Sequence, residues 1–274
     1  MEYRFRNLAA ATAVLTGFLM LLGVFTAAEG AGLTCAQRWP LCDGPLGGLL
    51  PANYLSGVEW FHRVVAAVTG LVILGQTVQA WRTGQSAGVR YASTLALVVL
   101  PVQVVLGMFT VTTYEWLVLV AHFATATLIF AAVVYAAARA YAGSMERTAV
   151  RARTATLVGA GLAPLAAVVS PRLVFEFGSA VQVAYYALLL TLFAALLSAT
   201  VWLRAERTRA VTGLATLVVA GLLVLGRQNY GRTVALGTVV ALGLVLVCSL
   251  VASRWAKAEI AVKRSTGIFA DSDD

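Results

Sequence analysis

The chain has 274 residues, of which 60% are hydrophobic and 12% are charged, and its mean hydropathy is +0.85. Soluble domains carry about 25% charged residues, so this composition excludes an ordinary soluble domain and favours a protein that spans a lipid bilayer. The net charge of +8 does not indicate a nucleic-acid partner. The basic residues lie in short gaps between apolar runs and form no basic face interleaved with aromatic residues.

The apolar runs predict an all-α integral membrane protein with eight transmembrane helices. The first run is too long for the apolar core of a cleaved signal peptide, so it is interpreted as a retained span. Each span is expected to be helical, because a backbone exposed to lipid has to satisfy its own hydrogen bonds. The predicted spans cover about residues 8–28, 57–80, 91–112, 116–138, 155–170, 179–203, 211–226 and 233–253.

The basic residues between the spans predict the orientation of the chain. With eight spans, fifteen Lys and Arg residues fall on the side of the N-terminus, and Arg38, Arg172, Arg227 and Arg232 fall on the other side. Because Lys and Arg are enriched in cytoplasmic segments, both termini are predicted to be cytoplasmic. The segment 29–56, which joins the first two spans, is then expected on the extracytoplasmic face of the cell membrane.

A charged gap near the middle of the sequence predicts two four-helix halves, as in a duplicated bundle. Residues 1–141 form the first half and residues 154–256 the second half. Residues 142–153 are interpreted as a cytoplasmic linker, and residues 257–274 as a cytoplasmic tail.

Two of the three cysteines, Cys35 and Cys42, lie in the outer loop 29–56. Thiols can oxidise outside the cytoplasm, so the two residues are candidate disulfide partners, with two free thiols as the alternative. A metal site is disfavoured, because no second pair of cysteine or histidine residues lies nearby in the sequence. Cys248, in the last predicted span, is interpreted as a small buried apolar residue.

The two histidines of the chain, His62 and His122, both fall inside predicted spans. Each lies five or six residues from the outer end of its span, which corresponds to a depth of about 8–9 Å. Two imidazoles at matching depth can bind one haem iron from opposite sides, so they are candidate axial ligands. The alternative is that each histidine is a hydrogen-bonded packing residue.

Charged and polar residues surround the histidines in the sequence. Glu59 precedes His62 by nearly one helical turn and is a candidate for proton or substrate chemistry, because ionisable residues within a membrane are costly. A simple Glu59–Arg63 ion pair is the alternative, and Arg63 could also bind a haem propionate. In the third span, Gln103, Gly107 and Thr110 share one helical face, which suits either a flat ring or a neighbouring helix.

Four motifs in sequence order resemble haem A synthase. They are G-x-G-L-x-C-x-x-x-W-P-L-C-x-G at 30–44, E-x-x-H-R at 59–63, Q-x-x-L-G-x-x-T-V at 103–111, and a histidine early in the fourth span. The resemblance covers about residues 22–135. It implies an eight-span enzyme that oxidises the C8 methyl group of haem O to a formyl group, giving haem A for terminal oxidases.

The resemblance also implies roles for individual residues. His62 and His122 become the axial pair of the first-half haem site, where haem O is the substrate. Glu59 becomes the catalytic carboxylate, and Cys35 and Cys42 become a disulfide. The implied partners are haem O, an electron donor that the sequence does not identify, haem O synthase, terminal oxidase subunits and membrane lipid.

The second half departs from the family pattern, in which another histidine pair holds a haem b. The corresponding stretches, 181–185 and 229–233, contain no histidine, and Gln182 or Tyr185 would be weak substitutes. One haem per chain is therefore predicted. Two alternatives to the enzyme remain, namely a non-catalytic haem carrier or oxidase assembly factor, and a b-type electron-transfer cytochrome with one bis-histidine haem.

Overall fold

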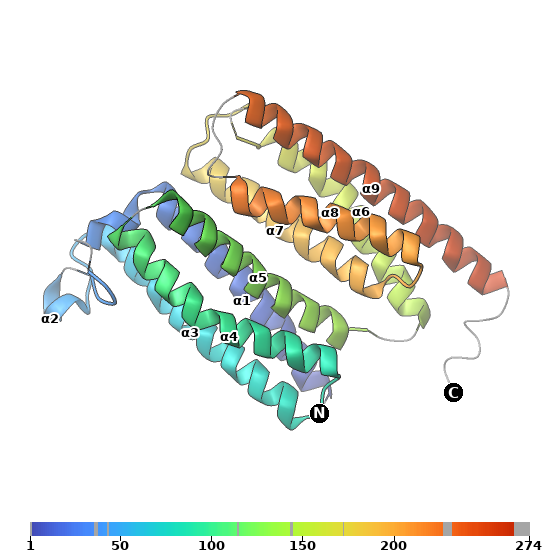
Figure 1. The fold of residues 1–274 in the computed structure, drawn as a ribbon, viewed down its shortest axis with the longest axis horizontal. Coiled ribbons are helices and arrows are strands. Elements are labelled where there is room, and N and C mark those ends of the chain that lie inside the picture. The colour runs from blue at the N-terminus through green and yellow to red at the C-terminus, as the bar shows by residue number, and fades with distance from the viewer. Residues whose placement is uncertain are drawn as a thin grey trace. The chain divides into compact units, whose positions relative to one another are not determined.

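A computed structural model describes residues 2–35, 38–42, 44–113, 115–142, 145–171, 173–226 and 232–265. Within these ranges all regular secondary structure is helical, as the sequence predicted (Figure 1). The described residues form eight long helices, α1 (Glu2–Ala28), α3 (Tyr54–Arg82), α4 (Ala87–Thr112), α5 (Trp116–Ala140), α6 (Met145–Val168), α7 (Ser179–Trp202), α8 (Glu206–Leu225) and α9 (Arg232–Ser265). Two short helices, η1 (Ala31–Cys35) and α2 (Pro45–Gly48), lie between α1 and α3.

Seven of the long helices are long and apolar enough to cross a membrane, among the residues that the structure describes. The exception is α6, which forms where the fifth span was predicted. Its first turns contain Arg147, Arg151 and Arg153, and these charges lower its apolar character. The chain is therefore a helical, multi-pass membrane protein, whereas a crossing by α6 stays a prediction.

The helices extend beyond the predicted apolar runs. α1 begins at Glu2 instead of near residue 8, and α9 continues to Ser265 instead of ending near residue 253. The predicted linker 142–153 becomes helical from Met145 onward, and the predicted tail 257–274 begins as part of α9, with residues 266–274 outside the described residues. Apolar runs mark the part of a helix in lipid, whereas intrahelical hydrogen bonds continue through polar residues beyond the hydrocarbon.

The helices divide into two compact units, which do not follow the sequence strictly. The first unit comprises Met1–Ala136 and Phe177–Tyr186, and the second comprises Ala137–Glu176 and Ala187–Asp274. The first turns of α7 therefore belong to one unit and the rest of that helix to the other.

In the first unit, α3 packs against α1 on one side and against α4 on another, with η1 also in contact with α3 (Figure 1). Gly17 of α1 faces Phe130 of α5, where a Cβ atom would lie 3.4 Å from the ring. The start of α3 is fixed by a reciprocal cap. The Asn53 side chain accepts a hydrogen bond from the Ser56 backbone, and the Ser56 hydroxyl accepts one from the Asn53 backbone, each at 3.0 Å.

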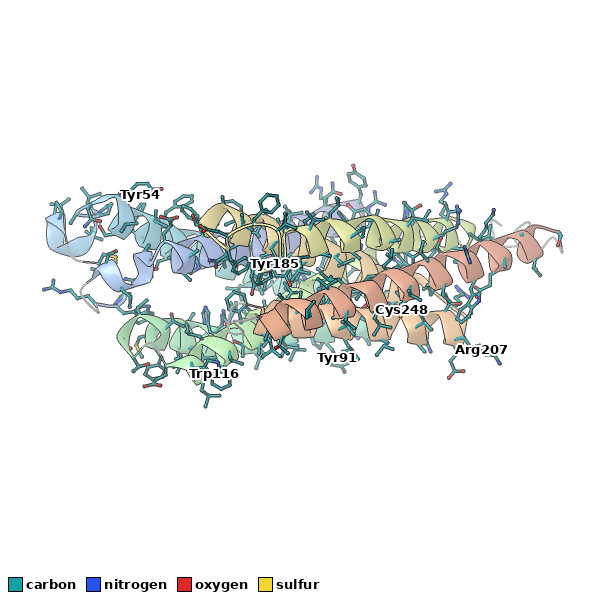
Figure 2. All side chains as sticks on the ribbon, turned by 90° about the horizontal axis from the view of Figure 1, so that it is seen from above. Tyr54, Tyr91, Trp116, Tyr185, Arg207 and Cys248 are labelled. Atoms are coloured by element: carbon teal, nitrogen blue, oxygen red, sulfur yellow. A yellow bond between two sulfur atoms is a disulfide. The ribbon has the colours of Figure 1, made fainter. Side chains whose placement is uncertain are left out.

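In the second unit, α9 packs along α6 and also contacts α8. Gly159 of α6 lies close to α7 and α9, because a Cβ atom there would lie 2.9 Å from Cδ2 of Leu196 and 3.0 Å from Oγ of Ser249. Thr208 of α8 donates to Glu259 of α9 at 3.3 Å. Cys248 of α9 is a buried free thiol (Figure 2).

Candidate functional site

His62 lies on α3 and faces α1 at a glycine. A Cβ atom at Gly23 would lie 3.2 Å from Nε2 of His62, which is closer than most such contacts in proteins. A larger residue at position 23 would therefore press on the nitrogen that a metal would bind. His62 is eight residues into α3, about 12 Å along the helix axis, because α3 starts three residues earlier than predicted.

His122 lies on α5 and contacts two residues of α4. Its Nε2 is 3.2 Å from Nε2 of Gln103, and the Gln103 Oε1 accepts a hydrogen bond from the Thr125 hydroxyl. With the amide in this orientation, Gln103 donates to an unprotonated Nε2 and the proton of His122 is on Nδ1. Nδ1 is buried and has no hydrogen-bond partner among the residues that the structure describes, and a Cβ atom at Gly107 would lie 3.2 Å from Cε1 of the same ring.

The two imidazoles both lie in the first unit. His122 is six residues into α5, about 9 Å along its axis. The structure thus brings the two predicted ligands into one unit, where His62 faces α1 and His122 faces α4.

Glu59, on α3 in the same unit, is buried, with only 5% of its surface exposed. Its Oε1 accepts a hydrogen bond from Nε of Arg63 at 2.8 Å, which is the helical ion pair considered from the sequence. A Cβ atom at Gly32 of η1 would lie 3.7 Å from its other oxygen, Oε2. The carboxylate is therefore enclosed between α3 and the segment that leads into the outer loop.

Arg63 also reaches the loop between the two cysteines. Nη1 donates to the carbonyl oxygen of Pro40 at 2.8 Å, and Nη2 donates to that of Arg38 at 3.3 Å. All three guanidinium nitrogens are thus engaged by protein atoms. Cys35 and Cys42 form the predicted disulfide, with their Cα atoms 4.4 Å apart, and both residues are buried (Figure 2).

The remaining residues expected at the site take different positions. Gln103 and Gly107 both lie against His122, whereas the Thr110 hydroxyl donates to the Gly107 carbonyl within its own helix at 2.7 Å. Sequence reasoning missed Gly23, Gly32 and Thr125. Thr125 could have been found from its spacing of three residues from His122, but a glycine in an apolar run carries no such signal.

The stretches considered as substitutes for a second histidine pair have partners of another kind. Gln182 donates to the Phe177 carbonyl at 2.9 Å. Tyr185 is buried and its ring contacts Phe177 and Tyr186, with centroids 6.0 and 5.5 Å apart (Figure 2). Of the stretch 229–233, residues 229–231 lie outside the described residues, and α9 begins at Arg232.

Fold and site together define a multi-pass helical membrane protein with two histidines and a carboxylate in one unit. The sequence model of the family described as cytochrome oxidase assembly protein matches residues 6–171, which is more than half of the chain. The chain therefore belongs to this family. The resemblance to haem A synthase is confirmed at the family level.

Curated relatives carry two different names. A protoheme IX farnesyltransferase from Halobacterium salinarum is 45% identical over 107 residues, which cover 39% of this chain and 23% of that protein. One from Haloarcula marismortui is 37% identical over 150 residues, 54% of this chain and 32% of that protein. A heme A synthase from Bacillus licheniformis is 27% identical over 136 residues, 48% of this chain and 44% of that protein. The chain thus spans less than half the length of each of these relatives.

Proposed function

We propose that this protein is a haem A synthase-type oxidoreductase, which oxidises the C8 methyl group of haem O to a formyl group. The observation that carries the proposal is the buried Glu59 carboxylate, one turn before His62, in a unit that also contains the second histidine, His122. The heme A synthases among the relatives support the same reading.

The residues present fit a haem better than a bare metal ion. Among the described residues, no group of three or more His, Cys, Asp or Glu side chains could hold a metal ion. Two imidazoles suit an iron atom whose other four ligands come from a porphyrin. Gly23 lies next to Nε2 of His62 and Gly107 next to Cε1 of His122, so neither position places a side chain against these ring atoms.

His62 and His122 would hold the haem through their Nε2 atoms. For His122, binding through Nε2 would require the Gln103 amide to give up its present hydrogen bond to that atom. The Gln103 amide would keep its bond to Thr125, and the Nδ1 proton would remain on the buried side of the ring. Haem supplies the redox-active iron at which a methyl group can be oxidised.

Glu59 would take part in proton transfer. Conversion of a methyl group to a formyl group breaks C–H bonds and adds oxygen, either from O2 with electrons from a donor or from water with loss of electrons to an acceptor. Both routes require proton transfer, so a carboxylate beside the ring is useful. Arg63 and the enclosure by η1 hold the carboxylate in one position, as positioning of a catalytic base requires. The Arg63 guanidinium is engaged by Glu59 and by the loop, so its proposed contact with a propionate requires a change of partners.

The proposal includes location and partners. The outer loop with Cys35 and Cys42 would face the extracytoplasmic side of the cell membrane, and both termini would be cytoplasmic. Haem O synthase would supply the substrate, terminal oxidase subunits would receive the product, and a separate electron donor would serve the site. The family description, cytochrome oxidase assembly protein, supports this setting.

The test is expression of the full chain in cells that make haem O but no haem A. Extracted haems are separated by chromatography and identified by mass. We expect haem A or its hydroxylated precursor with the unchanged chain, and bound but unmodified haem O with Glu59→Gln. Glu115→Gln, at the start of α5, is the matched control. Product from Glu59→Gln at the unchanged level would contradict the catalytic role.

A second candidate function is haem binding without oxidation, in a carrier or assembly factor. The observation that favours it is that segments of this chain match both heme A synthases and protoheme IX farnesyltransferases. The names of these relatives describe different reactions on haem, so the property that they share is haem binding. In the same experiment, haem O that is bound at one per chain but never modified would support the carrier, or a b-type cytochrome, over the enzyme.

A further inference from the structure

The Arg63 side chain connects two parts of the first unit that are far apart in the sequence. Its helical partner is Glu59, four residues before it. Its other partners, the carbonyl groups of Arg38 and Pro40, lie 25 and 23 residues before it. Both carbonyl groups belong to the ring of residues that the Cys35–Cys42 disulfide closes.

The residues at the start of the same loop also pack against Glu59. The ring begins at Cys35, the last residue of η1, and Gly32 of η1 lies against Oε2 of Glu59 and against Val111 of α4. Cys42, which ends the ring, has its sulfur 3.9 Å from the Ser56 carbonyl oxygen at the start of α3. A disulfide sulfur has no proton to donate, so this is a packing contact.

We propose that Arg63 is a positioning residue that locks the Cys35–Cys42 loop onto α3, so that the redox state of the loop is transmitted to the Glu59 carboxylate. The planar guanidinium has donors in a fixed fork, and this geometry lets one side chain bind a carboxylate and two carbonyl groups at once. When the disulfide is reduced, the ring opens and the two carbonyl groups are no longer held at Arg63. The guanidinium then reorients and Glu59 changes its hydrogen bonding.

The Arg63→Lys variant distinguishes the hydrogen bonds of the guanidinium group from its positive charge. An ammonium group on a flexible stem keeps the positive charge beside Glu59 but does not span the three acceptors. Arg63→Lys is therefore expected to release the loop, whereas Arg82→Lys, at the far end of α3, is the matched control.

The first measurement is the rate at which a phosphine reductant opens the disulfide of the purified full chain, followed by alkylation and mass spectrometry. Both cysteines are only 1% exposed, so reduction reports opening of the loop. Loss of hydrogen bonds from a charged donor predicts reduction about tenfold faster in Arg63→Lys. Arg82→Lys is expected to react at the rate of the unchanged chain. An equal rate in Arg63→Lys overturns the proposal.

The second measurement follows Glu59 by infrared difference spectroscopy, comparing oxidised and reduced protein. A carboxylate signal that is absent from Glu59→Gln belongs to Glu59. We expect this signal on reduction of the unchanged chain and its loss in Arg63→Lys. If Arg63→Lys does not fold, the unchanged chain and the Cys35→Ser/Cys42→Ser variant still provide the test, because the open ring should give the Glu59 spectrum of the reduced protein. No change at Glu59 on reduction overturns the proposal.

The consequence for haem oxidation rests on the proposed function, but neither measurement needs haem turnover. If the Glu59 signal changes on reduction but no haem A is formed, the enzyme proposal is refuted and the Arg63 proposal stands. If haem A is formed but the Glu59 signal does not change on reduction, the Arg63 proposal is refuted and the enzyme proposal stands.

Discussion

The two units of the protein are built from similar helices but differ in the residues that their polar contacts join. In the first unit, side-chain hydrogen bonds run from Arg63 to the outer loop and between Gln103 and His122. In the second unit, Thr208 donates to Glu259 on a neighbouring helix, and the buried Thr212 and Thr216 donate to carbonyl groups of their own helix at 2.8 Å. Both units therefore have polar bonds between segments, but both histidines of the chain lie in the first unit, which is the unit suited to haem chemistry.

The family match covers most of the first unit and, in the second unit, α6. It ends at residue 171, so α7, α8 and α9 lie beyond it. Both histidines of the chain are in the first unit. We infer that the second unit acts as scaffold, and the following variants are chosen to break or sharpen this comparison.

The largest effect is expected at the histidines. His62→Ala or His122→Ala removes one axial ligand and should abolish the bis-histidine haem spectrum, whereas Gln182→Ala and Tyr185→Phe should leave it unchanged. The measurement is the absorption spectrum of the purified chain together with a haem count, which we expect to be one per chain. A spectrum that persists in both histidine variants would refute the ligand assignment, and a count of two would refute the scaffold role.

A comparison of two glycines tests whether haem binding requires the absence of a side chain beside His62. Gly23→Val places a side chain 3.2 Å or less from Nε2 of His62, so haem binding should fall about tenfold or more, an overpacking cost of 1–3 kcal/mol. Gly221→Val, in α8, is the matched control, because nothing lies within 4 Å of its Cβ position. Haem titration of the two variants measures the difference. Equal affinity would show that haem binding does not depend on a glycine at position 23.

Removal of the disulfide tests how much the outer loop stabilises the first unit. Closure of so short a loop contributes about 2–3 kcal/mol on the chain-entropy model, so Cys35→Ser/Cys42→Ser should lower the free energy of unfolding by this amount. Cys248→Ser, in the second unit, removes the free thiol as a control. Denaturant titration in detergent micelles measures both variants. A larger loss in the control would show that the loop is not the main contribution.

Much of the fold could be predicted, because lipid allows few backbone structures. Apolar runs located all eight long helices. The matched depth expected for His62 and His122 did not hold along their helices, because α3 begins earlier than its apolar run and places His62 eight residues from its start, against six for His122. Helix ends were less predictable, since α9 continues for a dozen residues beyond the apolar run near residue 253. The backbone acceptors of Arg63 could not be predicted, because carbonyl groups carry no sequence signature and reach Arg63 only through the folded loop.

The smallest effect concerns two helix starts, one in each unit, that single substitutions can change. The Asn53 side chain caps the start of α3, whereas the residue before α8 is Ala205, whose side chain cannot accept a hydrogen bond. Loss of an N-cap costs about 1 kcal/mol, so Asn53→Ala should destabilise the protein by this amount and Ala205→Asp should stabilise it by a similar or smaller amount. The same micelle titration measures both changes. Opposite signs would show that local capping rules act alike in both units, and equal signs would contradict this.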